Sequence, residues 1–361
     1  MKRRTLLSAA VGLAAGMGLP ARASSASRIR IATEEAFSTR EHMRAMKALV
    51  DAHPEVTRFD YKLWRMITGN LEADTPKRLL DFAQLRLPEM DQYGVTMQLL
   101  SLTSPGVQML DKDVAVGVAE STNDELAEVI ARHPGRFAGL ATVAPQDPAR
   151  AAKEIERAKN RLRLNGIVIN SHTNNEYLDN RKYWPILEAA AAMDMPIYIH
   201  PRTPSDQMRA PMDDYNMGSA FWGYGIETST HFVRIMMSGA FDRFPNLTIV
   251  LGHMGEAVHF WIWRLDYMSK AGVQRGETPI KLLPSEYLRR NLRITTSGQE
   301  NPAALRYSID VLGLWNVMWA IDYPYQETPG AVRFMETAPL TEPERDAIYF
   351  QNAQRVFNIK L

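Results

Sequence analysis

Short β-rich runs alternate with longer helical patterns along almost the whole chain, and this alternation limits the fold more than any other feature. We expect strands at residues 28–33, 95–102, 137–143, 167–170, 196–200, 247–251, 292–296 and 317–321. Strands separated by helices pair in parallel through right-handed crossovers. Eight such units predict an α/β protein of the (β/α)₈ TIM barrel type. An open doubly wound sheet is the alternative, but no glycine-rich phosphate loop follows an early strand.

Two longer excursions interrupt the alternation, at residues 38–70 after the first strand and 203–225 after the fifth. Loops of this length are uncommon unless they serve a function. We therefore expect lid insertions over the catalytic face, or alternatively contacts between subunits. Aromatic residues in or beside these stretches, among them Phe37, Trp64, Phe221 and Trp222, are expected at this face.

The first residues of the chain have the form of a targeting signal. Arg3 and Arg4 form a twin-arginine pair, a weakly apolar stretch follows at residues 9–19, and Ala21-Arg22-Ala23 has the small-x-small form of a cleavage site. We interpret residues 1–23 as a twin-arginine (Tat) signal peptide rather than a surface tail. The expectation is a periplasmic protein with one barrel domain over residues 27–361 and no membrane association after cleavage.

Charge and cysteine content exclude several classes of partner and chemistry. The formal net charge of +1 gives no indication of a nucleic-acid partner. The 361 residues contain no cysteine, which excludes disulfides, thiolate nucleophiles and cysteine metal sites. Oxygen and imidazole groups remain available as metal ligands.

Ionisable residues follow several of the expected strands directly. The apolar run 196–199 ends at His200, Glu34 follows the first strand, and Asp322 follows the eighth. The carboxyl ends of parallel strands meet at one mouth of a barrel. Two carboxylates and one imidazole suit one divalent ion, Zn²⁺, Mn²⁺ or Mg²⁺. Taken singly, each residue also has a structural interpretation: His200 as a core histidine, Glu34 as a surface charge and Asp322 as a turn cap.

Other histidines differ in how well their surroundings point to function. His253 lies between two glycines, and Glu256 is placed to orient its ring. His172 follows the fourth strand and is expected to contact substrate. His231, in the first turns of a helix over residues 228–243, is expected to be half buried. The histidines interpreted as surface residues are His42, His53, His133 and His259.

Six stretches of the sequence carry a resemblance to a known family. They are residues 31–37 (IATEEAF), 100–108 (LSLTSPGVQ), 196–202 (PIYIHPR), 239–256 (GAFDRFPNLTIVLGHMGE), 294–298 (ITTSG) and 320–325 (AIDYPY). With them the chain resembles the metal-dependent amidohydrolase superfamily (amidohydrolase-related family 2), in the branch of 2,3-dihydroxybenzoate, γ-resorcylate and 5-carboxyvanillate decarboxylases. The resemblance implies a (β/α)₈ barrel with one divalent metal ion and a homodimer or homotetramer.

Strand ends and resemblance together assign roles to individual residues. The expected metal ligands are Glu34, His200 and Asp322, the expected catalytic residues are Asp322, His231 and His253, and the expected substrate contacts are Arg202, Glu256 and His172. Many family members carry Glu-x-His after the first strand. Here the third position is Ala36, as in the Glu-Glu-Ala-Phe form of the 2,3-dihydroxybenzoate decarboxylases that the chain resembles.

Three functions are compatible with this set of residues. The first is nonoxidative decarboxylation of a hydroxylated aromatic carboxylic acid, with Asp322 delivering a proton to the ring carbon that bears the carboxylate. The alternative is metal-dependent hydrolysis of an ester, lactone or amide, with Asp322 accepting a proton from water. The third is a non-catalytic periplasmic binding protein on the same scaffold.

Overall fold

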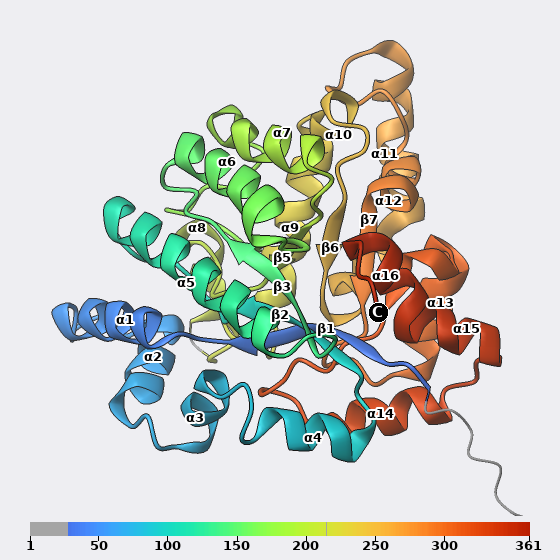
Figure 1. Ribbon diagram of the computed structural model, residues 1–361. Helices are drawn as coiled ribbons and strands as arrows, with labels where there is room; N and C mark the ends of the chain where they lie inside the picture. Colours follow the sequence, from blue (N-terminus) through green and yellow to red (C-terminus); the bar gives the residue numbers. More distant parts are fainter. Residues whose placement is uncertain (1–27, 214) are drawn as a thin grey trace, which may run out of the picture.

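Eight strands in the described residues pair in sequence order, each parallel to the next. The computed structural model describes residues 28–213 and 215–361 (Figure 1). The strands are β1 (Ile31–Phe37), β2 (Met97–Leu102), β3 (Phe137–Thr142), β4 (Gly166–Asn170), β5 (Ile197–His200), β6 (Ile249–Leu251), β7 (Leu292–Thr295) and β8 (Val317–Met318). The backbone N–H of Thr33 donates to Trp319 O at 3.1 Å, and that of Ala36 donates to Tyr323 O at 2.7 Å. These bonds join the first strand to the last segment, so the predicted (β/α)₈ barrel is confirmed.

Helices surround the strands, as Figure 1 shows. They are α1 (Arg40–Ala52), α2 (Phe59–Gly69), α3 (Asp74–Leu80), α4 (Arg86–Tyr93), α5 (Lys112–Arg132), α6 (Pro148–Arg157), α7 (Trp184–Ala192), α8 (Asp206–Arg209), α9 (Gly223–Met237), α10 (Ala240–Arg243), α11 (Ile262–Arg275), α12 (Pro284–Asn291), α13 (Pro302–Leu312), α14 (Thr328–Thr337), α15 (Glu342–Asp346) and α16 (Asn352–Phe357). Short 3₁₀ segments lie at Arg181–Tyr183, Ala210–Met212, His253–Trp261 and Leu314–Asn316, and π segments at Ala158–Leu162 and Ala347–Gln351.

The strands are apolar because both of their faces are buried. Inside the barrel lie Ile31, Met97, Leu99, Ala138, Leu140, Val168, Tyr198, Val250 and Met318. Phe357 of α16 belongs to the same cluster, and its carbonyl accepts from Asn165 Nδ2 at 3.0 Å, just before β4 begins. The C-terminal segment therefore closes the amino end of the barrel and leaves the carboxyl end for the site.

Several expected boundaries differ from the structure. The first strand was expected over residues 28–33, but β1 runs from Ile31 to Phe37, so Glu34 lies within the strand instead of following it. The eighth strand was expected over residues 317–321, but its ladder ends at Met318 because Trp319 N donates to Ile348 O at 2.9 Å. The last helical region, from α15 to α16, is interrupted by the π segment Ala347–Gln351. The segment after β6 begins as an irregular turn, in which His253–Ala257 all have positive φ between 49° and 68°.

The two long excursions are folded, and Arg58 Nη1 in the first lies 3.7 Å from Asp206 Oδ1 in the second. The first contains α1 and α2, and the second contains α8 and the start of α9. Asp60 on α2 accepts from Arg202 Nη2 at 3.2 Å, just after β5. This bond fastens the first excursion to the segment just after β5, and the role of the two excursions as lids stays a prediction.

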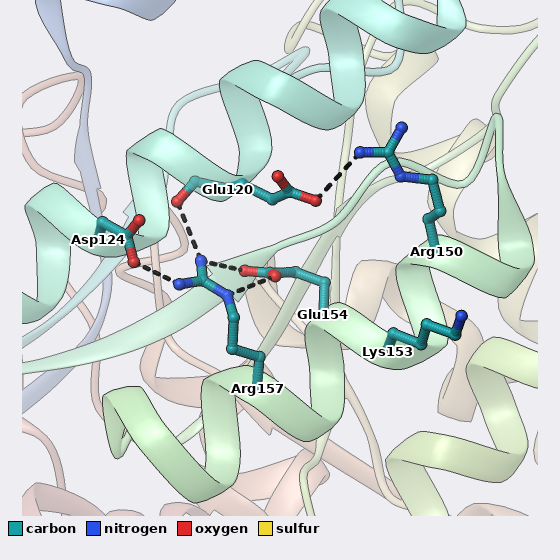
Figure 2. A pocket seen from close by; sticks show the side chains of 6 residues that line it. All are labelled: Glu120, Asp124, Arg150, Lys153, Glu154 and Arg157. Atoms are coloured by element: carbon teal, nitrogen blue, oxygen red, sulfur yellow. Dashed lines mark hydrogen bonds and ion pairs between the residues drawn. The ribbon is translucent and has the colours of Figure 1, made fainter.

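A hollow of about 310 Å³ lies on the outer helical layer between α5 and α6 (Figure 2). Arg157 at its centre is bonded to Asp124 at 2.5 Å and to both oxygens of Glu154. Asn123 links Glu154 to the carbonyl of Thr142 in β3. Because positive and negative side chains here neutralise one another, we assign the hollow a structural role in clamping α5, α6 and β3.

The predicted signal peptide, residues 1–23, lies outside the described residues. Among the residues that are described, we find no helix with both the length and the apolar character needed to cross a bilayer.

Candidate active site

Three of the residues predicted as metal ligands come together at the carboxyl end of the barrel. One ligand atom from each of Glu34, His200 and Asp322 lies within 4.8 Å of the others. Glu34 belongs to β1, His200 ends β5, and Asp322 follows β8. Because these strands are distant in sequence, closure of the barrel is what assembles the group.

The two oxygens of Glu34 have different surroundings. Oε2 accepts from the hydroxyls of Tyr198 and Ser297, and from Thr295 Oγ1 at 3.0 Å. Oε1 is buried without a hydrogen-bond partner among the described residues, and it lies 3.4 Å from His200 Nε2. A buried oxygen without a partner is costly unless something else satisfies it. This arrangement fits a cation at Oε1, while the hydroxyls hold Oε2 in place.

The ring of His200 is held in an orientation suited to a ligand. Its Nδ1 lies 2.9 Å from Pro201 O, which can only accept, so Nδ1 carries the proton. Nε2 is then left with its lone pair toward Glu34 and Asp322. A backbone carbonyl holding the second nitrogen in this way is typical of metal-binding histidines.

His253 completes the ring of polar atoms around the site. Its Nε2 lies 3.7 Å from both Glu34 Oε1 and Asp322 Oδ2, and its Nδ1 lies 2.7 Å from Glu256 Oε1. The predicted orienting contact between Glu256 and His253 is therefore present. The left-handed turn at His253–Ala257 brings these two side chains together across three residues.

Charges in the site shift the pKa values of its members in the metal-free protein. Burial raises the pKa of Asp322, and the nearby charge of Glu34 raises it further. Burial on its own would raise the pKa of Glu34 too, but His253, His200 and the hydroxyl donors outweigh burial and lower it. Burial would lower the pKa of His253, yet Glu34 and Glu256 raise it well above its usual value.

His231 lies in a separate buried cluster. It is fully buried rather than half buried; its Nε2 accepts from Leu178 N at 3.0 Å, and its Nδ1 lies 3.3 Å from Ser171 Oγ. Both nitrogens are therefore engaged by protein groups, which leaves no free atom for substrate. The sequence predicted a half-buried catalytic histidine, whereas these contacts favour a structural role.

His172 and Arg202, both expected to contact substrate, are also enclosed by protein. His172 Nε2 donates to Thr203 O at 3.1 Å, and Arg202 donates to His172 O and to Asp60. Both side chains are buried. Together they connect the loops after β4 and β5 to α2.

Several assignments made from the sequence are wrong. His42 and His259 are buried, not on the surface: His42 bonds to Ser38 and Gly106 O, and His259 to Ser308. His53 is exposed as expected. Phe37 and Trp64 are fully covered by other side chains, Phe37 by Phe82 and Trp64 by His42, so neither ring faces an open site. Phe221 and Trp222 are exposed.

Sequence reasoning missed the residues that support the ligands. Tyr198 lies inside an apolar strand, two residues before His200, so the alternation of side chains in a strand points both into the barrel. Thr295 ends β7 and Ser297 follows two residues later, and both hydroxyls donate to Glu34 Oε2. These polar residues can be read from the sequence, but no local pattern indicates that they converge on Glu34.

Comparison with known proteins agrees with this geometry. The family model described as Amidohydrolase matches residues 29–359. The chain therefore belongs to the amidohydrolase family. A gamma-resorcylate decarboxylase of a Polaromonas species is 33% identical over 339 residues, which cover 91% of this chain and 98% of that protein.

Two solved structures share most of the fold. The 5-carboxyvanillate decarboxylase from Sphingomonas paucimobilis is 52% identical, with a TM-score of 0.89, and the match covers 92% of this chain and 100% of that one. A 5-carboxyvanillate decarboxylase from Novosphingobium aromaticivorans, in complex with manganese and 4-hydroxy-3-methoxy-5-nitrobenzoic acid, is 38% identical with a TM-score of 0.86. That match covers 92% of this chain and 96% of the other.

Proposed function

We propose that this protein is a metal-dependent nonoxidative decarboxylase of a hydroxylated aromatic carboxylic acid. The observation that carries the proposal is the convergence of Glu34, His200 and Asp322 at the barrel mouth, with Glu34 Oε1 buried and lacking a donor among the described residues. The similarity to decarboxylases of hydroxylated aromatic acids, over more than nine-tenths of the chain, supports the same reaction class.

Glu34 Oε1, His200 Nε2 and the carboxylate of Asp322 hold one divalent ion in this proposal. Manganese in the Novosphingobium enzyme supports that ion class. When bound, the ion supplies a Lewis acid for the carboxylate and the adjacent phenolic oxygen of the substrate. The negative charge of Glu34 and the carboxyl oxygen of Asp322 that carries no proton suit a divalent cation.

Asp322 and His253 carry the proton transfer and the developing charge. Asp322 delivers its proton to the ring carbon that bears the carboxylate. The bond from that carbon to the carboxylate then breaks, its electron pair restores the aromatic ring, and carbon dioxide leaves. His253, whose charged form Glu34 and Glu256 favour, stabilises negative charge on the phenolic oxygen.

A paired assay tests the reaction class. One arm follows carbon dioxide release from 5-carboxyvanillate, 2,6-dihydroxybenzoate and other hydroxybenzoates with the Mn²⁺-loaded protein. The other arm follows hydrolysis of aryl esters and lactones. Carbon dioxide release that Asp322→Asn abolishes supports the proposal. Turnover confined to the ester arm would instead establish the hydrolase alternative.

Self-association is part of the proposal. None of the fourteen residues of α11 is buried within the described chain. Large side chains are exposed there and just before it: Phe260 at 65%, Trp261 at 59%, Trp263 at 69%, Tyr267 at 64% and Met268 at 63%. An apolar surface of this kind marks an interaction site. We propose that it forms the interface of a homodimer or homotetramer, which sedimentation of the wild type and Trp263→Glu would test.

Export is also proposed, from the sequence alone. Arg3 and Arg4 with the stretch at residues 9–19 support Tat-dependent transport to the periplasm. Fractionation of cells that carry wild-type or Arg3→Lys/Arg4→Lys protein distinguishes this from retention in the cytoplasm.

A further inference from the structure

Glu35 lies beside the metal ligand Glu34 on β1, but its carboxylate is directed elsewhere. The pairing of β1 with β2 shifts register between Ala32 and Glu35, and such a bulge changes the direction in which side chains point. Glu34 consequently reaches Tyr198 inside the barrel, whereas Glu35 reaches the segment that follows β8. Glu35 is fully buried and takes no part in the reaction described above.

The carboxylate of Glu35 binds the backbone on both sides of Asp322. Its Oε1 accepts from Ile321 N at 3.0 Å, and its Oε2 accepts from Tyr323 N at 3.2 Å. The amide between them, Asp322 N, donates to the carbonyl of Glu34 at 3.1 Å. Three consecutive amides are thus held by two neighbouring residues of β1.

Asp322 needs such support because of its backbone conformation. Its φ is 77°, in the left-handed region that residues other than glycine seldom adopt. This conformation persists only where the surroundings enforce it. Its neighbours 321 and 323 are also past the end of the β8 ladder, which stops at Met318. Regular sheet pairing therefore does not position the carboxylate of Asp322.

A second contact, from Arg86, holds the same segment. The guanidinium carbon of Arg86 lies 4.3 Å from the centre of the Tyr323 ring. Arg86 itself is buried, and its Nη2 donates to Ala36 O at 2.6 Å, next to Glu35. The backbone of Tyr323 is bound by Glu35 and its ring by Arg86, so both groups restrict the same short segment.

We propose that Glu35 is a positioning residue, which holds the Ile321–Tyr323 backbone so that the carboxylate of Asp322 faces Glu34 and His200. The inference rests on the proposed role of Asp322 as metal ligand and proton donor. It predicts that Glu35 controls metal affinity and proton delivery without touching the ion or the substrate.

The variant Glu35→Gln keeps size and shape but replaces one acceptor oxygen with a donor. One of the two amides at residues 321 and 323 then loses its acceptor. We expect Mn²⁺ affinity, measured by equilibrium dialysis, to fall by roughly ten- to a hundredfold, as for other groups that orient metal ligands. We also expect kcat to fall more than KM changes, and residue-resolved hydrogen exchange at residues 321 and 323 to accelerate while strands β4 and β5 stay protected.

Glu154→Gln is the matched control, because Glu154 is also buried and bonded on both oxygens but lies between α5 and α6 (Figure 2). It should leave Mn²⁺ affinity and kcat unchanged. Equal losses in Glu35→Gln and Glu154→Gln would indicate general destabilisation and overturn the proposal, as would Glu35→Gln with wild-type Mn²⁺ affinity and wild-type exchange.

If Glu35→Gln does not fold, hydrogen exchange of the wild-type protein tests whether Glu35 positions the segment. Amides 321 and 323 should be protected like those of the barrel strands. Exchange as fast as in exposed loops would contradict the proposal. Failure of the wild type to bind Mn²⁺ would refute the proposed function instead. The exchange measurement would then be the test of Glu35 as a positioning residue.

Discussion

Arg202 Nη2 and Asp60 Oδ2 lie 3.2 Å apart, and each side chain is only 3% exposed. Arg202 lies two residues after His200, whereas Asp60 lies on α2 in the first excursion. A buried ion pair therefore fastens that excursion to the strand end that bears the proposed metal ligand His200. Arg202 was expected to contact substrate, but in the structure its charge is directed at Asp60 and the carbonyl of His172.

Removing one partner of this pair should be strongly destabilising. Asp60→Ala leaves the Arg202 charge buried without its partner, for which losses of about 3–5 kcal/mol in unfolding free energy are typical. Denaturant unfolding of the metal-free protein measures the loss. Asp74→Ala, which removes an exposed partner of Arg78, is the control and should cost under about 1 kcal/mol. Equal losses in the two variants would show that the buried pair contributes no more to the unfolding free energy than the exposed pair.

The hydroxyl of Tyr198 should contribute to metal binding through Glu34. Tyr198→Phe removes one of the donors to Glu34 Oε2 and leaves the aromatic ring in the barrel interior. We expect Mn²⁺ affinity to fall by about tenfold with little change in the far-ultraviolet circular dichroism. Tyr183→Phe is the control, because it removes a comparable bond to Glu176 far along the chain from the ligands. Unchanged affinity in Tyr198→Phe would mean that the remaining donors suffice.

Gly252 tests how closely the carboxylate of Glu34 is confined. A Cβ at this position would lie 2.6 Å from Glu34 Oε2 and 2.8 Å from Oε1. Gly252→Ala should therefore displace Glu34 and weaken Mn²⁺ binding without removing any ligand. In Gly117→Ala, the control within α5, the new Cβ meets no described atom within 4 Å. That change should raise stability by about 0.5–1 kcal/mol. Wild-type Mn²⁺ affinity in Gly252→Ala would disprove the confinement.

Buried histidines should make the protein sensitive to acid. Burial lowers the pKa of His231 to about 3 and that of His259 to about 4. The unfolded chain binds these protons near pH 6.5, whereas the folded protein does not, so stability is lost as the pH falls below about 6.5. Each such histidine contributes a slope of about 1.4 kcal/mol per pH unit, down to its folded pKa.

Thermal unfolding between pH 7 and pH 4.5 measures this slope. His259→Phe preserves the ring beside Tyr307 and should make the slope shallower by the contribution of one histidine. His53→Phe, which replaces an exposed histidine instead of a buried one, is the control for the substitution itself. A steeper dependence of stability on pH in His259→Phe would contradict the interpretation of His259 as a neutral buried group.

The sequence by itself determined the barrel and the identity of the residues at its mouth. Strand and helix patterns are local, because burial on both faces demands apolar runs and helical spacing demands its own period. Once eight parallel strands are expected, residues such as Glu34, His200 and Asp322 are placed at one end by topology. The pairing of His253 with Glu256 could also be predicted, because both residues lie in one short turn.

Only the tertiary structure decided which polar atoms those residues face. Tyr198 and Thr295 meet Glu34 across the barrel, Glu35 binds amides almost three hundred residues later in the chain, and His231 is enclosed by the loop after β4. Contacts of this kind depend on how strands twist, where one bulges and how loops pack above them. A local sequence pattern does not specify these contacts. It therefore identified the residues that can perform chemistry, but not the residues that hold them in position.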